Sequence, residues 1–427
     1  MMTLKSKLTL PAAGLSGFEP PMSEEETSVQ GVLHRFAKDV MRPLGAELDK
    51  MTAEEVIAPG SPYYSVFAEF AKLGIDPSML AELPSDVAVR MESLIGEELG
   101  WGDAGLAVTL GVAGFPGEMA ATIGNQELVD LCTGRIGCWM ITHPDKGSDV
   151  QIFDMARDWT PGQQGNKGSM WGKLQGDEIV INGQCSAWVS NGAVAQVALG
   201  YISAEYDGSF FDADGRPHGM SVIIPLDLPG VSKGKPLDKI GQRSLPQGEI
   251  YFDNVRVPKR FAVALKDDYY GNMASAWSYA GTVMAQTFTG VARSAFELAL
   301  QYCHERKQGG KLLIDHQLTR YRLGDMLRRV ELCRSVARRS LSFARLSPLT
   351  HPYVTAAGKV TVTQEAMKVV DEAFQLFGGS ATSREYPIER LYRDTRVALI
   401  EDGESYVLTM RLGILAQQLY AEGWSQN

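Results

Sequence analysis

The sequence has few cysteines and no motif that would hold a disulfide framework or a metal. Its five cysteines (Cys132, Cys138, Cys185, Cys303 and Cys333) are scattered, and none forms a Cys-x-x-Cys pair. An odd number with these spacings indicates neither a set of disulfides nor a thiolate metal site. We therefore expect a reducing compartment and no bound metal.

Long apolar runs and nucleotide-binding glycine motifs are also missing. No run reaches the roughly 18 apolar residues of a membrane span, and the N-terminus lacks the apolar core of a signal peptide. The sequence contains no G-x-x-x-x-G-K-[ST], and no G-x-G-x-x-G follows a predicted strand. This pattern disfavours a Rossmann dinucleotide site and predicts a cytoplasmic protein without membrane insertion.

The composition is that of an ordinary globular protein. With 427 residues, 44% of them hydrophobic and 22% charged, the chain can bury a core for two to three domains. A net charge of -10 argues against nucleic acid as the main partner. Seven arginines between positions 320 and 339 alternate with apolar residues at helical spacing, and we expect them on a solvated or subunit-facing helix surface.

The first third of the chain is predicted to be helical. Residues 1–25 are polar, contain three prolines and are expected to form a flexible arm. Apolar residues recur at helical spacing from Val29 onward, with Pro43 expected to bend or end that helix. Further helices are predicted at 63–73, 86–100 and 104–123, so residues 26–136 should form an α-helical domain.

A different pattern predicts strands and then long helices. Short β-branched or aromatic segments occur at 178–183, 197–202, 221–224 and 250–253, with a hairpin turn at Gly176-Asp177 and a long loop at 154–170. Helical spacing returns at 272–305, 316–347, 352–377 and 403–420. The predicted class is α+β multidomain, with a central antiparallel β-domain at 137–259 and a helical bundle at 260–427.

An acidic cluster near the C-terminus is the candidate for a catalytic base. Glu401, Asp402 and Glu404 surround Gly403 directly after an apolar stretch that should be helical or buried. Burial raises the pKa of a carboxylate, and a glycine lets the backbone approach a ligand. A helix N-terminus, whose dipole favours acids, explains the same residues.

Two further segments suit a flat cofactor with phosphates. Trp188 and Ser190 would face the same side of a strand, offering a ring to pack on and a hydroxyl to donate. Arg306 ends one long helix and Gln317 begins the next, where an arginine could bind a pyrophosphate, and paired glycines follow Gln375. A core tryptophan, a surface arginine and a helix C-cap explain these residues equally well.

Taken in order, these segments resemble the acyl-CoA dehydrogenase family over about residues 25–420. Each match is weak alone, but their order and spacing together are specific. The matching segments are Ile141–Asp149, Trp188–Gly192, Asp238–Arg243, Phe252–Pro258, Tyr302–Gln317, Gln375–Gly379, Glu385–Asp394 and Ile400–Gly403. The resemblance implies an N-terminal helical domain, a central β-domain and a C-terminal four-helix bundle, assembled as a homotetramer or homodimer.

The resemblance also implies an FAD site shared between subunits. Thr142 would bond the edge of the flavin ring, Ser148 would lie near the phosphates, and Trp188 and Ser190 would flank the ring. Three neighbours are assigned to the same cofactor site: Trp139, Ile141 and Gly147. Across the subunit boundary, the pyrophosphate and adenosine would be held by Arg306, Gln317, Gln375 and Gly379.

By the same resemblance, the reaction is α,β-dehydrogenation of an acyl thioester. Asp402 would take the α-proton, FAD would receive the hydride from the β-carbon, and an electron-transferring flavoprotein would accept the electrons. The family base is normally glutamate, and Gly281 stands where many members have an arginine that contacts CoA. An acyl-carrier-protein thioester, or a non-thioester substrate of a flavin oxidase or monooxygenase, therefore remains an alternative.

Overall fold

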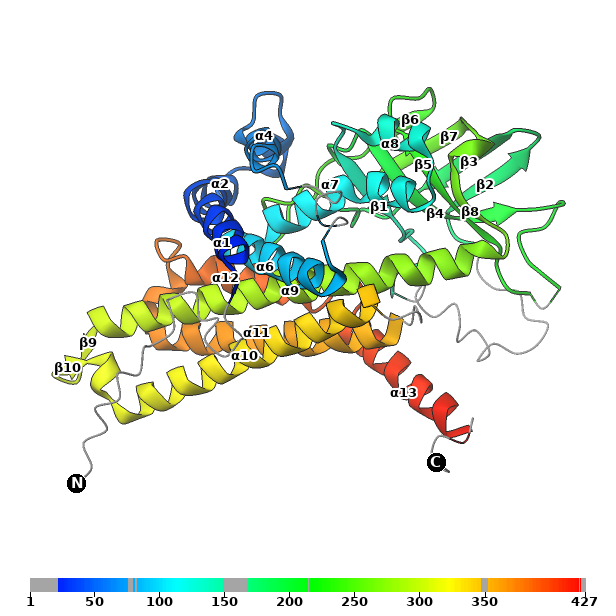
Figure 1. The fold of residues 1–427 in the computed structure, drawn as a ribbon. Coiled ribbons are helices and arrows are strands. Elements are labelled where there is room, and N and C mark those ends of the chain that lie inside the picture. The colour runs from blue at the N-terminus through cyan, green and yellow to red at the C-terminus, as the bar shows by residue number, and fades with distance from the viewer. Residues whose placement is uncertain are drawn as a thin grey trace.

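Three parts follow one another along the chain and meet around one very long helix, α9 (Asp268–Glu305), as Figure 1 shows. The computed structural model describes residues 22–75, 80, 83–148, 167–213, 215–346, 352–421 and 423. Most of the predicted N-terminal arm and most of the predicted loop at 154–170 lie outside these residues. The order of helices, sheet and helices confirms the predicted fold class.

The N-terminal part is helical, as predicted. Its principal helices and short helical turns are α1 (Glu24–Phe36), η1 (Ala37–Met41), α2 (Arg42–Leu48), α3 (Ala53–Ile57), η2 (Pro62–Tyr64), α4 (Ser65–Ala71), α6 (Ser85–Gly102), α7 (Ala104–Thr122) and α8 (Gln126–Cys132). Pro43 does not end the first helix. The chain instead passes through the wider π turn η1, and Pro43 falls in the first turn of α2.

The central part is one mixed sheet. Its strands are β1 (Gly137–Met140), β2 (Met170–Gln175), β3 (Glu178–Gln184), β4 (Val197–Glu205), β5 (Gly219–Pro225), β6 (Val231–Lys233), β7 (Ile250–Pro258) and β8 (Ala262–Leu265), in the order β6-β7-β3-β2-β4-β5-β8. Pairing is antiparallel except that β1 and β2 each run parallel to β4. The predicted hairpin joins β2 and β3, with Gly176 at φ +61°.

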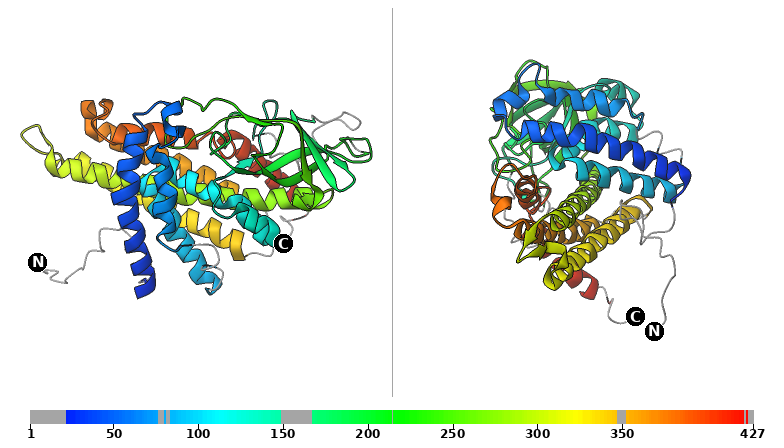
Figure 2. Two further views of the ribbon diagram at one scale, coloured as in Figure 1. Left: turned by 90° about the horizontal axis from the view of Figure 1, so that it is seen from above. Right: turned by 90° about the vertical axis from the view of Figure 1, so that its left-hand side faces the viewer.

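The C-terminal part packs three long helices and two shorter ones. After α9 come the two-residue strands β9 (Lys307–Gln308) and β10 (Lys311–Leu312), then α10 (Gln317–Leu346), α11 (Pro352–Phe377), the 3-10 turn η7 (Gly378–Thr382), α12 (Ile388–Ala398) and α13 (Ser405–Ala421). Seen from above, α1 crosses the long axis of this bundle steeply, and the sheet lies towards one end of α9 (Figure 2). Thus α9 touches all three parts.

An ion network inside the helical region corrects the prediction for the arginine-rich helix. Arg334 is not on a solvated surface: it is buried and donates to the Glu97 carboxylate of α6 at 2.7 and 3.0 Å. Arg293 of α9 donates to Glu97 at 2.9 Å and to Glu98 at 2.7 Å. The helical spacing correctly predicted the helix α10, but Glu97 of α6 covers part of the polar face of that helix.

The most apolar helix, α7, is long and apolar enough to cross a membrane by length and composition alone. More than half of its most apolar window, 56%, is buried inside the protein. Its Phe115 and Met119 pack with Trp139 and Tyr201 of the sheet. Such packing accounts for the apolar composition of α7 without a membrane.

Candidate active site between the sheet and the helical bundle

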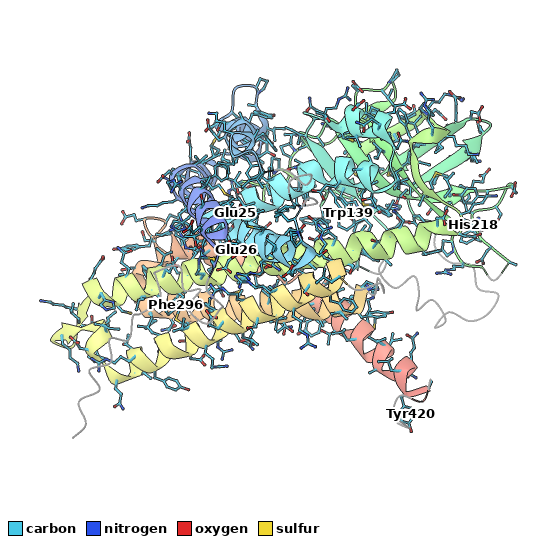
Figure 3. The ribbon with its side chains drawn as sticks, in the orientation of Figure 1. Glu25, Glu26, Trp139, His218, Phe296 and Tyr420 are labelled. Carbon is cyan, nitrogen blue, oxygen red and sulfur yellow. The ribbon has the colours of Figure 1, made fainter. Side chains whose placement is uncertain are left out.

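A cavity of about 910 Å³ lies where α7, the end of β1, α9 and the segment after α12 meet. Ligand pockets of this size usually hold a whole cofactor or a drug-sized molecule. Trp139, labelled in Figure 3, stands at this junction of sheet and helices. The cavity therefore occupies the boundary between the three parts of the chain.

One wall of the cavity is aromatic and rigid. The Phe115 ring meets the Trp139 ring edge-on with centroids 5.2 Å apart, and it stacks on Tyr279 of α9 at 6.2 Å. Met284 and Trp277 continue the apolar lining along α9. Such a wall can pack a flat ring or an apolar chain, and it offers few hydrogen bonds.

Another part of the cavity lining contains Glu401, Asp402 and Gly403 of the acidic cluster, which are carried on a tight loop. Asp402 and Gly403 both have left-handed backbones, with φ +49° and +95°. The Ser405 N–H and hydroxyl both donate to the Leu399 carbonyl, at 3.1 and 2.8 Å, and close the loop just before α13. A left-handed conformation is unusual for a residue with a side chain, so this loop turns Asp402 away from α12 and towards the cavity.

The Asp402 side chain is exposed to solvent at the cavity wall, and the protein that surrounds the cavity partly desolvates its carboxylate. Burial raises the pKa of Asp402 to about 6, while the positive charge of Lys359 on α11 opposes the rise. Within the described part of the chain, no side chain or backbone group donates a hydrogen bond to this carboxylate. A carboxylate that is desolvated and open to a ligand can act as a general base near neutral pH.

The other two acids of the cluster have different partners. Burial, and next the charge of Asp402, raises the pKa of Glu401 to about 7, and the Gln242 side-chain amide donates to Glu401. Glu404 instead accepts from the backbone N–H groups of Tyr406 and Val407 at the start of α13, at 2.9 and 3.1 Å. The helix N-terminus interpretation is therefore correct for Glu404 but not for Asp402.

A loop after β6 connects the acidic cluster to the turn at Trp188. The Lys239 ammonium donates to the Leu245 carbonyl at 2.8 Å and to the Gln247 side chain at 3.0 Å. Gln247 in turn donates to the Trp188 carbonyl at 2.9 Å. Lys239 lines the cavity, and its burial lowers the pKa of its amine to about 8.

Trp188 and Ser190 do not lie on a strand, so the prediction that they share one face of a strand is wrong. Trp188 lies in a turn, where its N–H donates to the Ser186 hydroxyl at 3.3 Å, and Ser190 forms only an isolated bridge with Gln247. A local hydroxyl acceptor competes here with the sheet for the backbone. Both residues nevertheless line the cavity, and the Trp188 side chain is 66% exposed.

Most residues predicted for the ring side of the cofactor come together at the cavity. Besides Asp402, they are Trp139, Ile141, Thr142, Gly147, Ser148, Trp188 and Ser190. The Thr142 and Ser186 hydroxyls bond each other. The Ser148 hydroxyl accepts from the Glu404 N–H at 2.9 Å, which ties the segment after β1 to the acidic loop.

The other four predicted cofactor residues do not reach this cavity. Arg306 and Gln317 stand at the end of α9 and the start of α10, and Gln375 and Gly379 stand at the end of α11 and in η7. All four are exposed. The Tyr302 ring stacks on Phe377 with centroids 4.1 Å apart, which places the ends of α9 and α11 side by side at this end of the bundle.

Comparison with known proteins identifies the family. The acyl-CoA dehydrogenase middle domain matches residues 138–255, and the acyl-CoA dehydrogenase C-terminal domain matches residues 278–418. The chain belongs to the acyl-CoA dehydrogenase family. It is accordingly an FAD-dependent oxidoreductase, as its resemblance implied.

Relatives and solved structures extend the family match over nearly the whole chain. A glutaryl-CoA dehydrogenase of Desulfococcus multivorans is 26% identical over 409 residues, covering 92% of this chain and 96% of the relative. The butyryl-CoA dehydrogenase of Megasphaera elsdenii superposes with a TM-score of 0.78 at 22% identity, over 94% and 100% of the two chains. The prolyl acyl carrier protein oxidase AnaB superposes with a TM-score of 0.76 at 17% identity, over 93% and 100%.

The residues around the cavity fit the flavin of an acyl-CoA dehydrogenase. The Trp139 indole Nε1 is buried with no hydrogen-bond partner among the described residues, and an orphaned buried donor is costly. The exposed Trp188 ring borders the same space. A flat ring with acceptor atoms along its edge would cover this ring and could satisfy a buried donor.

Three residues of the site were not assigned a role from the sequence. Gln242 lies in the segment Asp238–Arg243, which resembles the family, but only the fold brings its side-chain amide to the Glu401 carboxylate. Lys239 likewise lines the cavity from the same segment. Lys359 of α11 was missed, although a single lysine after Ala356-Ala357-Gly358 in a largely apolar helix face is a signal that could have found it.

Proposed function

We propose that this protein dehydrogenates an acyl-CoA thioester between its α and β carbons, with Asp402 as the base that takes the α-proton. The observation that supports this proposal is the Asp402 carboxylate, which lines the cavity and accepts no hydrogen bond from the residues that the structure describes. Its pKa of about 6 leaves roughly nine-tenths of the side chains ionised at pH 7. Asp402 is thus ready to accept a proton and is still basic enough to hold it.

The chain's own groups would position the thioester and exclude water. The aromatic wall of Phe115, Trp139 and Tyr279 would hold the acyl chain, while the left-handed turn at Asp402 would hold the carboxylate across the cavity. The usual glutamate base of the family is one methylene longer, so the α-carbon must sit closer to this turn. Hydrogen-bond donors aimed at the thioester carbonyl would make the α-proton more acidic.

FAD would lie along the residues that end β1 and form the Trp188 turn. When bound, it supplies an acceptor for the hydride that leaves the β-carbon. Thr142 and Ser190 would contact the ring, Ser148 the phosphate side, and Trp188 would cover one face, with the further contacts from Trp139, Ile141 and Gly147. Ser148 is already bonded to the Glu404 N–H, so its contact would link cofactor binding to the acidic loop.

A second copy of the chain would complete the cofactor site. Arg306, Gln317, Gln375 and Gly379 are exposed and lie outside the cavity that the ring-side residues line. If they bind FAD, they bind it in a neighbouring subunit, which supports a homodimer or homotetramer. An electron-transferring flavoprotein is the proposed electron acceptor.

The acyl carrier has a second candidate, a carrier-protein thioester. Gly281 faces α11, where an added Cβ would meet the Thr355 carbonyl at 3.3 Å. A longer side chain at 281 would have to move one of the two helices or leave that face, so the CoA-contacting arginine of many relatives has no simple equivalent here. The likeness to AnaB, which is named for an acyl carrier protein substrate, favours testing this candidate directly.

We also propose the domain boundaries 26–136, 137–259 and 260–427 after an arm of 25 residues, and a cytoplasmic location. The first boundary is supported by the change from helices to strands between α8 and β1. At the second boundary, β8 pairs with β5, so the sheet continues past residue 259 and the helices return only at α9. One hydrophobic cluster lies within the N-terminal part and a second within the sheet, whereas the cluster of the C-terminal helices also includes Ala104, Val108 and Leu245. Limited proteolysis with mass spectrometry would test the boundaries.

Anaerobic mixing of the FAD-loaded protein with acyl-CoAs and acyl-carrier proteins tests the reaction. Loss of the oxidised flavin absorbance on mixing with a thioester supports dehydrogenation. Fast reoxidation by oxygen with a hydroxylated product would instead support a monooxygenase.

We expect Asp402→Asn to retain FAD and to lower the reduction rate by roughly 10²- to 10⁴-fold, the usual contribution of a general base. Asp371→Asn, an exposed aspartate of α11, is the matched control. An unchanged rate in Asp402→Asn would eliminate Asp402 as the base.

A further inference from the structure

A lysine side chain is completely buried behind the acidic loop. Lys359 of α11 has no accessible surface, and its ammonium donates to the Gly403 carbonyl at 2.8 Å. Isolated charges are rarely buried, because removing an ammonium from water costs several kcal/mol unless partners compensate. The nearby charges that compensate this one are the carboxylates of Asp402, Glu401 and Glu404.

The bond from Lys359 falls on the backbone of the turn that carries Asp402. Gly403 follows Asp402 directly, and both have positive φ. A fixed carbonyl at 403 limits rotation of the peptide that joins the two residues. The same ammonium lowers the pKa of Asp402, against the effect of burial. One side chain thus acts on both the geometry and the charge of the loop.

We propose that Lys359 is a positioning residue for Asp402: it fixes the left-handed turn at 402–403 and stabilises the ionised carboxylate that faces the cavity. This inference rests on the proposed role of Asp402 as the base. Lys359 does not line the cavity, so it acts through Asp402 and not on the substrate. Its position behind the loop distinguishes it from Lys239, which lies in the cavity lining.

Other charged and titratable groups stand near the loop, and those that line the cavity with Asp402 are His143, Asp238, Lys239, Glu249, Arg396 and Glu401. Glu401 faces both lysines and is held by Gln242, and Glu404 caps α13. The buried Arg411 of α13 lies over the rings of Trp277 and Tyr353, at 5.5 and 5.0 Å. Lys359 is the cation whose charge acts on Asp402, and Glu401 is the neighbouring acid that repels Asp402 when both are ionised.

Two substitutions separate the charge of Lys359 from its hydrogen bond. Lys359→Met removes both and keeps a similar stem, whereas Lys359→Gln removes the charge and keeps a donor. Lys368→Met is the matched control, because Lys368 is on the same helix but is exposed and paired with Glu365. All variants are prepared as full chains with FAD bound.

The pH profile of flavin reduction by a thioester is the first measurement. Loss of a neighbouring opposite charge should raise the midpoint of the rising limb by about one to three pH units in both Lys359 variants. Lys359→Gln should approach the wild-type rate at high pH, while Lys359→Met should remain slower at every pH. The Lys368→Met profile should match the wild type. An unmoved midpoint in both Lys359 variants overturns the proposal.

Thermal stability of the same variants gives a readout that does not depend on activity. At pH 7, Lys359→Met should lower the melting temperature more in the wild-type background than in the Asp402→Asn background, because only the wild-type background loses the attraction between the Lys359 ammonium and an ionised Asp402 carboxylate. If Lys359→Met alone does not fold, the double variant with Asp402→Asn should fold. Equal falls in both backgrounds, or failure of the double variant as well, overturn the coupling.

The role of Asp402 as the base and the role of Lys359 as its positioning residue can be refuted independently. If Asp402→Asn keeps the wild-type rate, the proposed base is wrong whatever Lys359 does. If Asp402→Asn is inactive while the Lys359 variants keep the wild-type midpoint and show no coupling, Asp402 remains the base and Lys359 is only a structural residue.

Discussion

The pH dependence of turnover tests the raised pKa of the Asp402 carboxylate directly. Its pKa of about 6 results mainly from burial, and Lys359 limits the rise. A base must be ionised, so activity should be lost as the pH falls through this value. The ionised fraction is about one-eleventh at pH 5 and about ten-elevenths at pH 7, so kcat/KM should rise roughly tenfold between them. An ordinary exposed aspartate would be almost fully ionised at both pH values and would give a nearly flat profile.

The assay is anaerobic stopped-flow measurement of flavin reduction at low thioester concentration, in buffers of constant ionic strength. Glu401 needs a control, because burial and the adjacent Asp402 raise its pKa to about 7. In Glu401→Gln, the midpoint should stay near the pKa of Asp402. A wild-type rate that is constant from pH 5 to pH 7 would refute the assignment of a raised pKa to the base. A midpoint that disappears in Glu401→Gln would transfer the titration to Glu401.

Two further predictions concern the helices and the second half of the cofactor site. Glu97→Ala removes a carboxylate partner from two buried guanidinium groups, those of Arg293 and Arg334, and should lower the free energy of unfolding by about 3–5 kcal/mol in urea denaturation. Glu92→Ala, which breaks a more exposed pair, should cost less than about 1 kcal/mol. Arg306→Ala should weaken FAD binding about 10- to 100-fold, which is the loss expected for one charge-assisted hydrogen bond, and titration calorimetry would measure it. Arg320→Ala, at a nearby exposed site, is the control and should leave the affinity for FAD unchanged. Equal effects in both variants would show that Arg306 does not bind FAD.

One ion network joins all three parts of the chain beside the cavity. Arg393 of α12 donates to both oxygens of Asp49 after α2, at 2.9 and 2.7 Å, and to the Ile240 carbonyl of the loop after β6 at 2.8 Å. Arg243 of that loop donates back to the Asp49 and Met51 carbonyls, at 3.1 and 2.9 Å. The loop that carries Lys239 and Gln242 is thus held from two sides, which fixes its contacts with the acidic cluster.

The spacing of apolar and β-branched residues predicted helices and strands well where the residues within one segment decide its conformation. Apolar residues at helical spacing gave α6, α7, α10 and α11 to within a few residues, and β-branched runs gave β3, β4, β5 and β7. Predictions were wrong where a partner distant in the sequence decided the outcome. Arg334 is buried because Glu97 of α6 reaches it, and no spacing within α10 contains that information.

The turn at Trp188 shows a second kind of limit. An alternating aromatic and hydroxyl pattern is typical of a strand, but the Ser186 hydroxyl accepts the Trp188 N–H and forms a local turn instead. Gln247, almost 60 residues later, then holds the turn through the Trp188 carbonyl. Trp188 and Ser190 line the cavity, but their backbone forms a turn where a strand was predicted.

For the acidic cluster, the sequence by itself determined a carboxylate next to a glycine after a buried helix, and the order of segments determined the family. Only the tertiary structure decided which acid faces the cavity, which one caps α13 and which cation lies behind the loop. The physical reason is that a pKa depends on desolvation and on distances between groups that are far apart in the chain. Asp402 and Lys359 are 43 positions apart, and the packing of the acidic loop on α11 brings their charges together.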